Sequence, residues 1–195
     1  YGVADEAMRR FRYGVQVNSL GLTEPQPENN VYRILIEMLA VTLSKKARAR
    51  AVQLPAWNEA LGLPRPFDQQ WSLRMQQVVA YETNVCDTVD PLAGSYYIEK
   101  LTDEVEARAQ DYIDQIDRMG GAVAAIEKGF IQKEIGASAY RFQREIEKGE
   151  RIIVGLNRFQ THEDKLTGLL KVDPEVGAKQ VARLQELKGS RDNAA

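Results

Sequence analysis

The sequence predicts an α/β protein with parallel strands, followed by a mainly helical region. Over the first two thirds of the chain, short β-branched or alternating segments take turns with amphipathic helical patterns. That order is typical of βα units rather than of a helical bundle or a β-sandwich. From Thr102 onward, apolar residues recur mainly at helical spacing, so the second part of the chain is expected to be mainly helical.

The first expected strand is built around Tyr13, Val15 and Val17, which alternate with small or polar residues. A polar loop over residues 21–30 follows the strand. Asn29 or Asn30 can then cap a helix. At a period of 3.6 residues, the buried face of that helix would comprise Val31, Leu35, Met38, Leu39 and Thr42.

The second expected strand covers residues 48–54 and stops at Pro55. Its alternation sends Arg48 and Arg50 to one face and Gln53 to the other. Asp68 is expected to cap the next helix, whose buried face would hold Trp71, Met75, Val78 and Val79. A third strand is expected over residues 84–89, with Cys86 as a small core residue, and residues 90–95 form the loop after it.

The helical part contains two long apolar patterns. The first includes Val105, Ala109, Tyr112, Ile113 and Ile116 and is expected to end at Gly120-Gly121. The second includes Ile131, Ile135, Ala139, Phe142 and Ile146. Residues 151–155 read as a short late strand, residues 173–175 as the start of a last helix, and residues 189–195 as a tail or linker.

Composition excludes several classes of protein. The formal net charge is -2 with acids and bases interspersed, so neither a nucleic-acid-binding face nor a cationic membrane-surface helix is indicated. The longest apolar runs fall far short of the roughly 20 residues of a membrane span. Cys86 is the single cysteine and cannot form an internal disulfide, which suits the cytoplasm or an organelle matrix. Because the chain opens on Tyr1 without a leader, we expect sequence upstream of it.

Ligands of parallel α/β folds bind beyond the carboxyl ends of the strands, which points to the loops beginning near Asn18, Gln53 and Asp90. Two arginines on one strand face, Arg48 and Arg50, indicate either an anionic ligand or an exposed, ion-paired surface, and the residues alone leave both open. His162 has no second histidine or cysteine beside it, so we expect a solvated loop residue and no metal site.

Several motifs occur in an order that resembles one family. Residues 22–30 are similar to a Ser-Leu-Thr-x-x-x-Pro-x-Asn-Asn segment, residues 58–64 to Asp-Glu-Ala-Leu-Gly-Leu-Pro, and residues 90–96 to Asp-Pro-x-Gly-Gly-Ser-Tyr. Residues 119–129 and 153–157 also have close equivalents there. Taken together, the chain resembles the methylmalonyl-CoA mutase large-subunit family over nearly its whole length.

The resemblance implies a (β/α)8 TIM-type barrel through which an acyl-CoA is threaded, with adenosylcobalamin against its carboxyl end. Residues 1–101 would form the last strands of the barrel, 102–188 the helical region after it and 189–195 a tail or linker. It also implies carbon-skeleton isomerisation by a radical mechanism that the cofactor initiates. The expected partners are an acyl-CoA substrate and a cobalamin-binding domain or subunit that carries the cobalt ligand, within an oligomer.

By the same resemblance, Gln16, Asn18, Arg48 and Gln53 would bind substrate. The residues expected at the cofactor are Arg50, Tyr81, Asp90, Pro91 and Gly94. Arg50 in particular would read an anionic or strongly hydrogen-bonding group, either on the substrate or on a corrin amide. The family's tyrosine and histidine beside the migrating group would lie upstream of Tyr1, so the catalytic residues are unknown and this chain is not expected to be active alone.

Two positions depart from the family pattern, because Arg50 stands at its glutamine and Gln53 at its histidine. These changes favour a different branched acyl-CoA over methylmalonyl-CoA. The alternative is a non-catalytic, mutase-like structural subunit. A third hypothesis, an acyl-CoA enzyme without cobalamin, would require an acid–base pair that the sequence does not offer.

Overall fold

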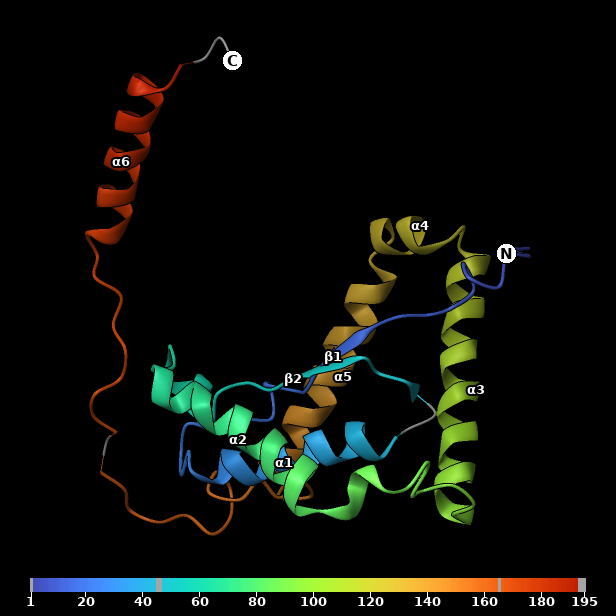
Figure 1. The fold of residues 1–195 in the computed structure, drawn as a ribbon. Helices are drawn as coiled ribbons and strands as arrows, with labels where there is room; N and C mark the ends of the chain where they lie inside the picture. Colours follow the sequence, from blue (N-terminus) through green and yellow to red (C-terminus); the bar gives the residue numbers. More distant parts are fainter. Residues whose placement is uncertain (1, 45–46, 165, 193–195) are drawn as a thin grey trace.

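The computed structural model describes residues 2–44, 47–164 and 166–192. Two short strands and a set of helices follow one another along the chain (Figure 1). In order they are β1 (Gly14–Gln16), α1 (Asn29–Leu43), β2 (Ala51–Gln53), η2 (Glu59–Leu61), α2 (Pro66–Glu82), η3 (Asn84–Cys86), α3 (Tyr96–Arg118), α4 (Ala122–Glu127), α5 (Phe130–Glu147) and α6 (Val176–Ser190). None of the helices in the described ranges combines the length and the apolar character that a membrane span requires.

The first part of the molecule is a βαβα unit. Strands β1 and β2 are parallel, and α1 and α2 lie together below the sheet in Figure 1. The core lies between these layers and consists of Val17, Ile34, Met38, Leu54, Met75 and Val79. The α/β class is therefore confirmed, while the described residues form one two-stranded sheet and do not display a closed barrel.

Of the face predicted for helix α1, Met38 is buried and the other residues are half-buried, while the most buried apolar residue is Ile34, which the prediction did not include. Ile34 and Met38 are buried, and Val31, Leu35 and Leu39 pack against them. Residue Glu28 stands at the N-cap without a side-chain bond, so neither asparagine caps the helix. The reason is that the Asn30 side chain is used elsewhere, in a buried hydrogen-bond network described below.

Helix α2 begins one turn earlier than expected. Arg65 is the N-cap, and Asp68, which was predicted as the cap, accepts the Arg65 backbone N–H at 2.9 Å from within the first turn. Met75 and Val79 are buried as predicted. Trp71 and Val78 are 43% and 46% exposed, because Ser72 takes the inward position and donates to Pro55 O at 2.8 Å.

The predicted strand over residues 84–89 is wrong. Residues Asn84–Cys86 form a 3₁₀ turn, and Cys86 is exposed rather than a core residue. Thr83 Oγ1 accepts the Val85 N–H at the start of this turn. A strand must pair its backbone N–H and C=O groups with a neighbour, and no described strand lies beside this segment.

The helical region is largely as predicted, with shifted boundaries. Helix α3 begins at Tyr96, ahead of the expected Thr102, because Ser95 caps it, and it ends before Gly120-Gly121 as predicted. Helices α5 and α6 are confirmed, with α6 extending to Ser190 and so into the expected tail, while α4 was not predicted. The expected strand at 151–155 is wrong: Val154 forms only an isolated bridge with Arg158, since Gly155 turns the chain at φ 82°.

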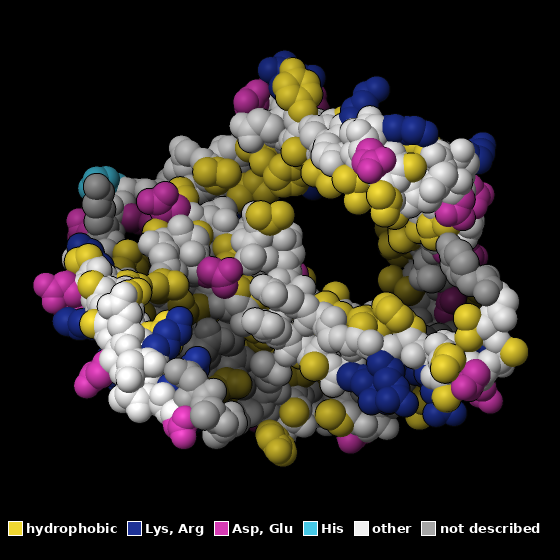
Figure 2. Space-filling view, turned by 90° about the horizontal axis from the view of Figure 1, so that it is seen from above, with side chains coloured by type: hydrophobic (Ala, Val, Ile, Leu, Met, Phe, Trp, Pro, Cys, Tyr) yellow, Lys and Arg dark blue, Asp and Glu magenta, His cyan; other side chains and the backbone are white. Residues whose placement is uncertain are grey.

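The two parts of the molecule differ in burial. Helices α3, α5 and α6 contain no buried residue, and in α4 only Ala125 is buried. Figure 2 shows an opening in the molecule whose rim is largely hydrophobic. Apolar residues of α3 such as Val105, Tyr112 and Ile113 are 59%, 46% and 46% exposed. The helical region thus has amphipathic helices whose apolar faces are not packed against the described core.

Candidate functional site

The sheet has one face covered by helices and one face open. Gly14, Val15 and Gln16 pair with Ala51, Val52 and Gln53 in register. The two valines are half-buried, whereas the other four residues are exposed. Because paired residues of parallel strands project to the same side, Gln16 and Gln53 stand side by side on the open face at the carboxyl end. The structure thus brings together two of the residues predicted for substrate.

Small residues occupy the rest of this open face. Gly14 and Ala51 pair with each other, and a Cβ built at Gly14 would lie 3.5 Å from the Ala51 Cβ. With no bulky side chain between the two ends of the strands, an extended ligand can approach the backbone closely. The open face therefore carries only small side chains between its amino end and the two glutamines.

Asn18, the third predicted substrate residue, lies just beyond the end of β1. Its Oδ1 accepts the Leu20 N–H at 2.9 Å, which shapes the turn that follows. Glu37 of α1 lies close to the same turn, and burial raises the pKa of its carboxyl while a bond from the Asn18 backbone lowers it. Glu37 Oε2 is buried without a hydrogen-bond partner among the described residues. Asn18 is thus held at the carboxyl end, near Gln16.

The amino end of the sheet is strongly basic. An open cavity of about 450 Å³ is lined by Arg48 and Arg50 together with Arg9, Arg10, Phe11, Arg12, Tyr13 and Ala47. Phe11 and Tyr13 stack with ring centroids 4.8 Å apart. Among the described residues, none of these five arginines forms an ion pair with a carboxylate. Such a group of guanidinium ions is suited to a polyanion.

The arginines are therefore separated from the glutamines. Three strand residues, at about 3.3 Å each, place roughly 10 Å between the two ends of the sheet. The predicted strand also starts too early, because Arg48 has a left-handed φ of 54° and β2 begins only at Ala51. Arg48 and Arg50 consequently do not share a strand face as expected; they share the cavity at the amino end.

The residues predicted for the cofactor do not converge. Tyr81, at the end of α2, is 86% exposed. Asp90, Pro91 and Gly94 form turns between η3 and α3, on the far side of the unit from the carboxyl ends of the strands (Figure 1). Arg50 lies in the basic cavity. The described residues thus do not form a common surface that fits a corrin ring.

A buried network of amides supports the loop after β1, and sequence reasoning missed it. Asn30 is fully buried, and its side-chain amide makes two hydrogen bonds to the backbone of Thr23. Its Oδ1 accepts the Thr23 N–H at 3.0 Å, and its Nδ2 donates to Thr23 O at 2.9 Å. It also donates to Trp57 O at 2.9 Å, which connects the loop to the segment after β2. The Pro-x-Asn-Asn motif carries the signal, although its asparagines at the start of a helical pattern predict a helix cap instead.

A second buried polar group supports the start of α2. Asp68 is fully buried, and its carboxylate accepts bonds from Arg65 and from Asn58 Nδ2 at 2.9 Å. These bonds, chiefly the one from the Arg65 side chain, hold the pKa of Asp68 well below its usual range. Asn58 belongs to the motif of residues 58–64, so that motif has a structural role here.

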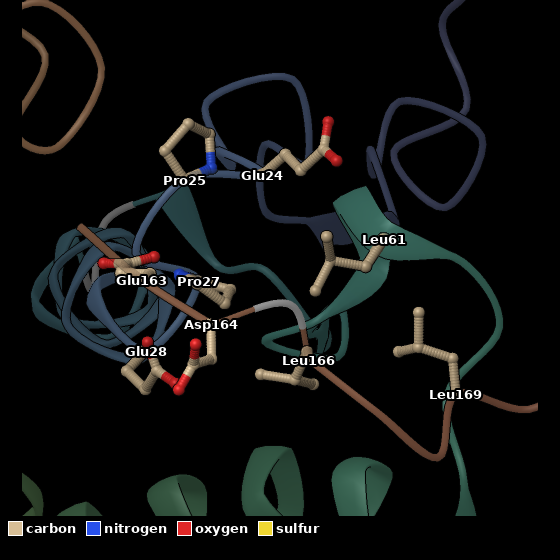
Figure 3. A pocket seen from close by; sticks show the side chains of 9 residues that line it. All are labelled: Glu24, Pro25, Pro27, Glu28, Leu61, Glu163, Asp164, Leu166 and Leu169. Atoms are coloured by element: carbon tan, nitrogen blue, oxygen red, sulfur yellow. The ribbon is translucent and has the colours of Figure 1, made fainter. Parts of the chain in front are cut away.

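Another cavity, of about 620 Å³, lies between the loop after β1, η2 and the segment that follows residue 162 (Figure 3). Four of its lining residues are acidic: Glu24, Glu28, Glu163 and Asp164. Like charges would repel a phosphate-bearing ligand there. Across the described parts of the chain, no group of three acidic, histidine or cysteine residues is arranged to hold a metal ion, and His162 is exposed.

Comparison with known proteins adds the family to this geometry. Residues 1–195 match the family described as methylmalonyl-CoA mutase. The chain is 54% identical over its whole length to ethylmalonyl-CoA mutase of Cereibacter sphaeroides and 52% identical to that of Methylorubrum extorquens. It is 39% identical, again over its whole length, to methylmalonyl-CoA mutase of Escherichia coli. These matches cover 30%, 29% and 27% of the respective relatives.

The chain thus spans less than a third of the length of these relatives, and the resemblance noted from its motifs is confirmed. The ordered motifs, the βαβα unit and the match over every residue agree with one another. The chain belongs to the methylmalonyl-CoA mutase family.

Proposed function

We propose that this chain is part of an adenosylcobalamin-dependent mutase that isomerises the carbon skeleton of ethylmalonyl-CoA. The choice of ethylmalonyl-CoA as substrate rests on the difference in sequence identity between two groups of relatives. The chain is 54% and 52% identical to two ethylmalonyl-CoA mutases, but 39% and 35% identical to the methylmalonyl-CoA mutases of Escherichia coli and Cereibacter sphaeroides. Arg50 and Gln53 stand where the family pattern has a glutamine and a histidine, and this difference agrees with a substrate other than methylmalonyl-CoA.

The geometry of the open face supports an acyl-CoA ligand. Coenzyme A carries its phosphates at one end and its acyl thioester at the other. The basic cavity at the amino end of the sheet suits the phosphates, because guanidinium groups bind them in a bidentate manner. Gly14 and Ala51 leave room for the linear arm. On this proposal Arg48 and Arg50 both bind the nucleotide end, which moves Arg50 away from the corrin.

At the carboxyl end, Gln16, Gln53 and Asn18 would hold the acyl group. Their amides donate to carbonyl and carboxylate oxygens but do not ionise, so they orient the acyl group without transferring protons. The hydrogen abstraction that begins such a rearrangement is the chemistry that the cofactor supplies when bound. Since the residues expected around the corrin do not converge in this chain, we propose that a further domain or subunit holds it. A relative from Aquincola tertiaricarbonis, 31% identical, is named as a large subunit.

The substrate is tested with the full-length protein. Ethylmalonyl-CoA, methylmalonyl-CoA and other branched acyl-CoAs are incubated with adenosylcobalamin and any cobalamin-binding subunit. Because an isomer has unchanged mass, the products are separated by chromatography before mass spectrometry. We expect ethylmalonyl-CoA to be converted with the highest kcat/KM. Bound cofactor without conversion of any acyl-CoA would instead favour the structural-subunit alternative.

The basic cavity is tested with Arg50→Met. Loss of one phosphate contact is expected to raise the KM for acyl-CoA by about tenfold, since a charge-assisted hydrogen bond contributes roughly 1.5–3 kcal/mol. Lys100→Met is the control, because the Lys100 side chain is 79% exposed and lies on α3. An unchanged KM in Arg50→Met together with weaker cobalamin binding would indicate that Arg50 binds the cofactor rather than the substrate.

A further inference from the structure

Two residues with unusual backbones meet in one contact. Among the described residues that are not glycine, only Gln26, Arg48 and Phe159 have positive φ, at 49°, 54° and 57°. Gln26 Nε2 donates to Phe159 O at 2.8 Å, although the two residues are 133 positions apart. A left-handed conformation costs a non-glycine residue about 1–3 kcal/mol and persists where its surroundings enforce it. Strain on both sides of one contact marks that contact as specific.

Gln26 uses all of its hydrogen-bonding groups here. Its side-chain amide also donates to Thr161 Oγ1 at 3.0 Å, and its Oε1 accepts a bond from Asn29 Nδ2 at 3.0 Å. Its backbone N–H donates to Glu163 Oε2 at 2.8 Å. Gly155 provides the space, because a Cβ built there would lie 3.0 Å from Gln26 Cδ. We refer to the contacts of Gln26 with residues 155–163 as the Gln26 latch.

Arg33 of α1 adds further hydrogen bonds between the same two segments that the Gln26 latch joins. One of its nitrogens donates to Val154 O at 2.8 Å. The other donates to Thr23 Oγ1 at 2.9 Å and to Asn30 Oδ1 at 2.7 Å. Thr23 and Asn30 are buried and fix the loop after β1. The segment that follows α5 is thereby connected, through side chains, to the loop that begins with Asn18.

We propose that Gln26 is a positioning residue for the mutase reaction. By joining the loop after β1 to residues 155–163, the Gln26 latch keeps Asn18 beside Gln16 and Gln53, where the acyl group binds. The C-terminal region thus sets the carboxyl end of the site without contacting the substrate. This inference rests on the proposed function, because it assigns the acyl end of the ligand to that loop.

The test uses full-length protein with its cofactor and compares Gln26→Ala and Gln26→Glu with Gln143→Ala. Gln26→Glu keeps the size of the side chain but replaces the two N–H donors by acceptors. Gln143 is a matched control, since its amide contacts only Glu147 within α5. Hydrogen exchange is measured over residues 18–28 and, for comparison, over α2. Kinetics are measured on ethylmalonyl-CoA, and binding is measured with free coenzyme A.

Both Gln26 variants are expected to exchange at least about tenfold faster over residues 18–28, because Gln26→Glu loses the two hydrogen bonds that the amide donates and Gln26→Ala also loses the one from Asn29 Nδ2. Exchange in α2 stays unchanged. We expect kcat to fall by about tenfold while the Kd for free coenzyme A stays the same, because its phosphates bind at the opposite end of the sheet. Gln143→Ala should behave as the wild type.

A second pair of variants probes the packing. Gly155→Ala and Gly149→Ala place a side chain at similar left-handed positions, φ 82° and 72°, but only the first would meet another residue. We expect faster exchange over residues 18–28 in Gly155→Ala alone. The positioning role would be overturned if every Gln26 variant kept the wild-type hydrogen exchange over residues 18–28 while still turning over substrate. It would also be overturned if hydrogen exchange became faster throughout α2. Wild-type protein that converts no acyl-CoA would refute the proposed function and the positioning role together.

Discussion

The helices of the βαβα unit and those of the helical region both carry apolar residues at helical spacing, but they bury them very differently. Apart from Ala125 of α4, the buried hydrophobic residues lie between Val17 and Val79. In α3 and α5 the apolar stripes exist in the sequence, yet the described structure leaves them exposed. A helix gains most of its stability from packing its apolar face rather than from propensity. The comparison therefore teaches that the unit packs its apolar residues against one another, whereas the described residues offer the apolar faces of α3 and α5 no such partner.

The largest effect should come from the core of the unit. Ile34 is fully buried between α1 and the sheet, and Ile34→Ala should destabilise the chain by about 3–4 kcal/mol, because it removes buried methyl groups and leaves a cavity. Ile113→Ala on α3, at 46% exposure, should lower the stability of the same chain by less than about 1 kcal/mol. Urea unfolding followed by tryptophan fluorescence measures both.

The same pair sharpens the comparison in the full-length protein. If the apolar face of α3 is packed there, Ile113→Ala should destabilise the full-length protein by about 2 kcal/mol or more, as a buried position does. Equal small losses in both contexts would show that the helical region is exposed in the intact protein as well.

The ion pair between the buried Asp68 and the partly exposed Arg65 should have the next largest effect. Asp68→Ala leaves Asn58 Nδ2 and the Arg65 side chain without their acceptor and should lower the free energy of unfolding by about 3 kcal/mol. The matched change in the helical region is Glu145→Ala, which removes the half-buried acceptor of the exposed Arg151 and should change stability by less than about 1 kcal/mol. A loss in Asp68→Ala no larger than that in Glu145→Ala would contradict the comparison.

Acid should act on the unit through the same carboxylate. The pKa of Asp68 is lowered by folding, so its contribution to stability is present above the pKa of the unfolded chain and is lost as the pH falls below it. Between pH 7 and pH 3 the wild type should therefore lose more stability than Asp68→Asn. Urea midpoints at the two pH values provide the measurement, and parallel losses in the two proteins would show that other groups dominate acid unfolding.

The smallest effect is expected from the ion pairs of the helical region. Lys179 lies 3.2 Å from Asp173 and 3.0 Å from Glu175 at the start of α6, with all three side chains exposed. Lys179→Met should change stability by less than about 0.5 kcal/mol, since solvent screens such pairs. A loss above 1.5 kcal/mol, measured by thermal unfolding at low and at high salt, would indicate a partner that orders α6.

The sequence predicted the elements that depend on local pattern. The stripe of α1, the inward Met75 and Val79, and the glycine stop of α3 all follow from spacing and turn chemistry. Residues 84–89 carry two valines and a threonine, and this composition predicts a strand, but strand pairing depends on neighbouring strands rather than on propensity.

The placement of the candidate site residues follows from the sequence only in part. Gln16 and Gln53 were expected at the carboxyl end, and the observed register sets them side by side. Arg48 and Arg50 were expected on the open strand itself, but a left-handed turn at Arg48 places them at the other end, and such a backbone has no sequence signal in arginine. Likewise, nothing local marks Gln26 for the latch, because its partners in residues 155–163 are more than 130 positions away.

The Gln26 latch has a consequence for the order in which the chain folds during synthesis. The core of the unit contains no buried residue beyond Val79, and the last residue packed against it is Val85, so it can form while the later helices are still being made. Gln26 and Arg33 can form their hydrogen bonds to residues 154–163 only after these residues have been synthesised. Until then, these bonds do not stabilise the left-handed backbone of Gln26. Loop closure over such a separation is slow compared with helix formation. The carboxyl-end loop should therefore be the last part of the unit to reach its final shape, so a nascent chain halted before residue 154 would carry a folded core with an unfinished binding site.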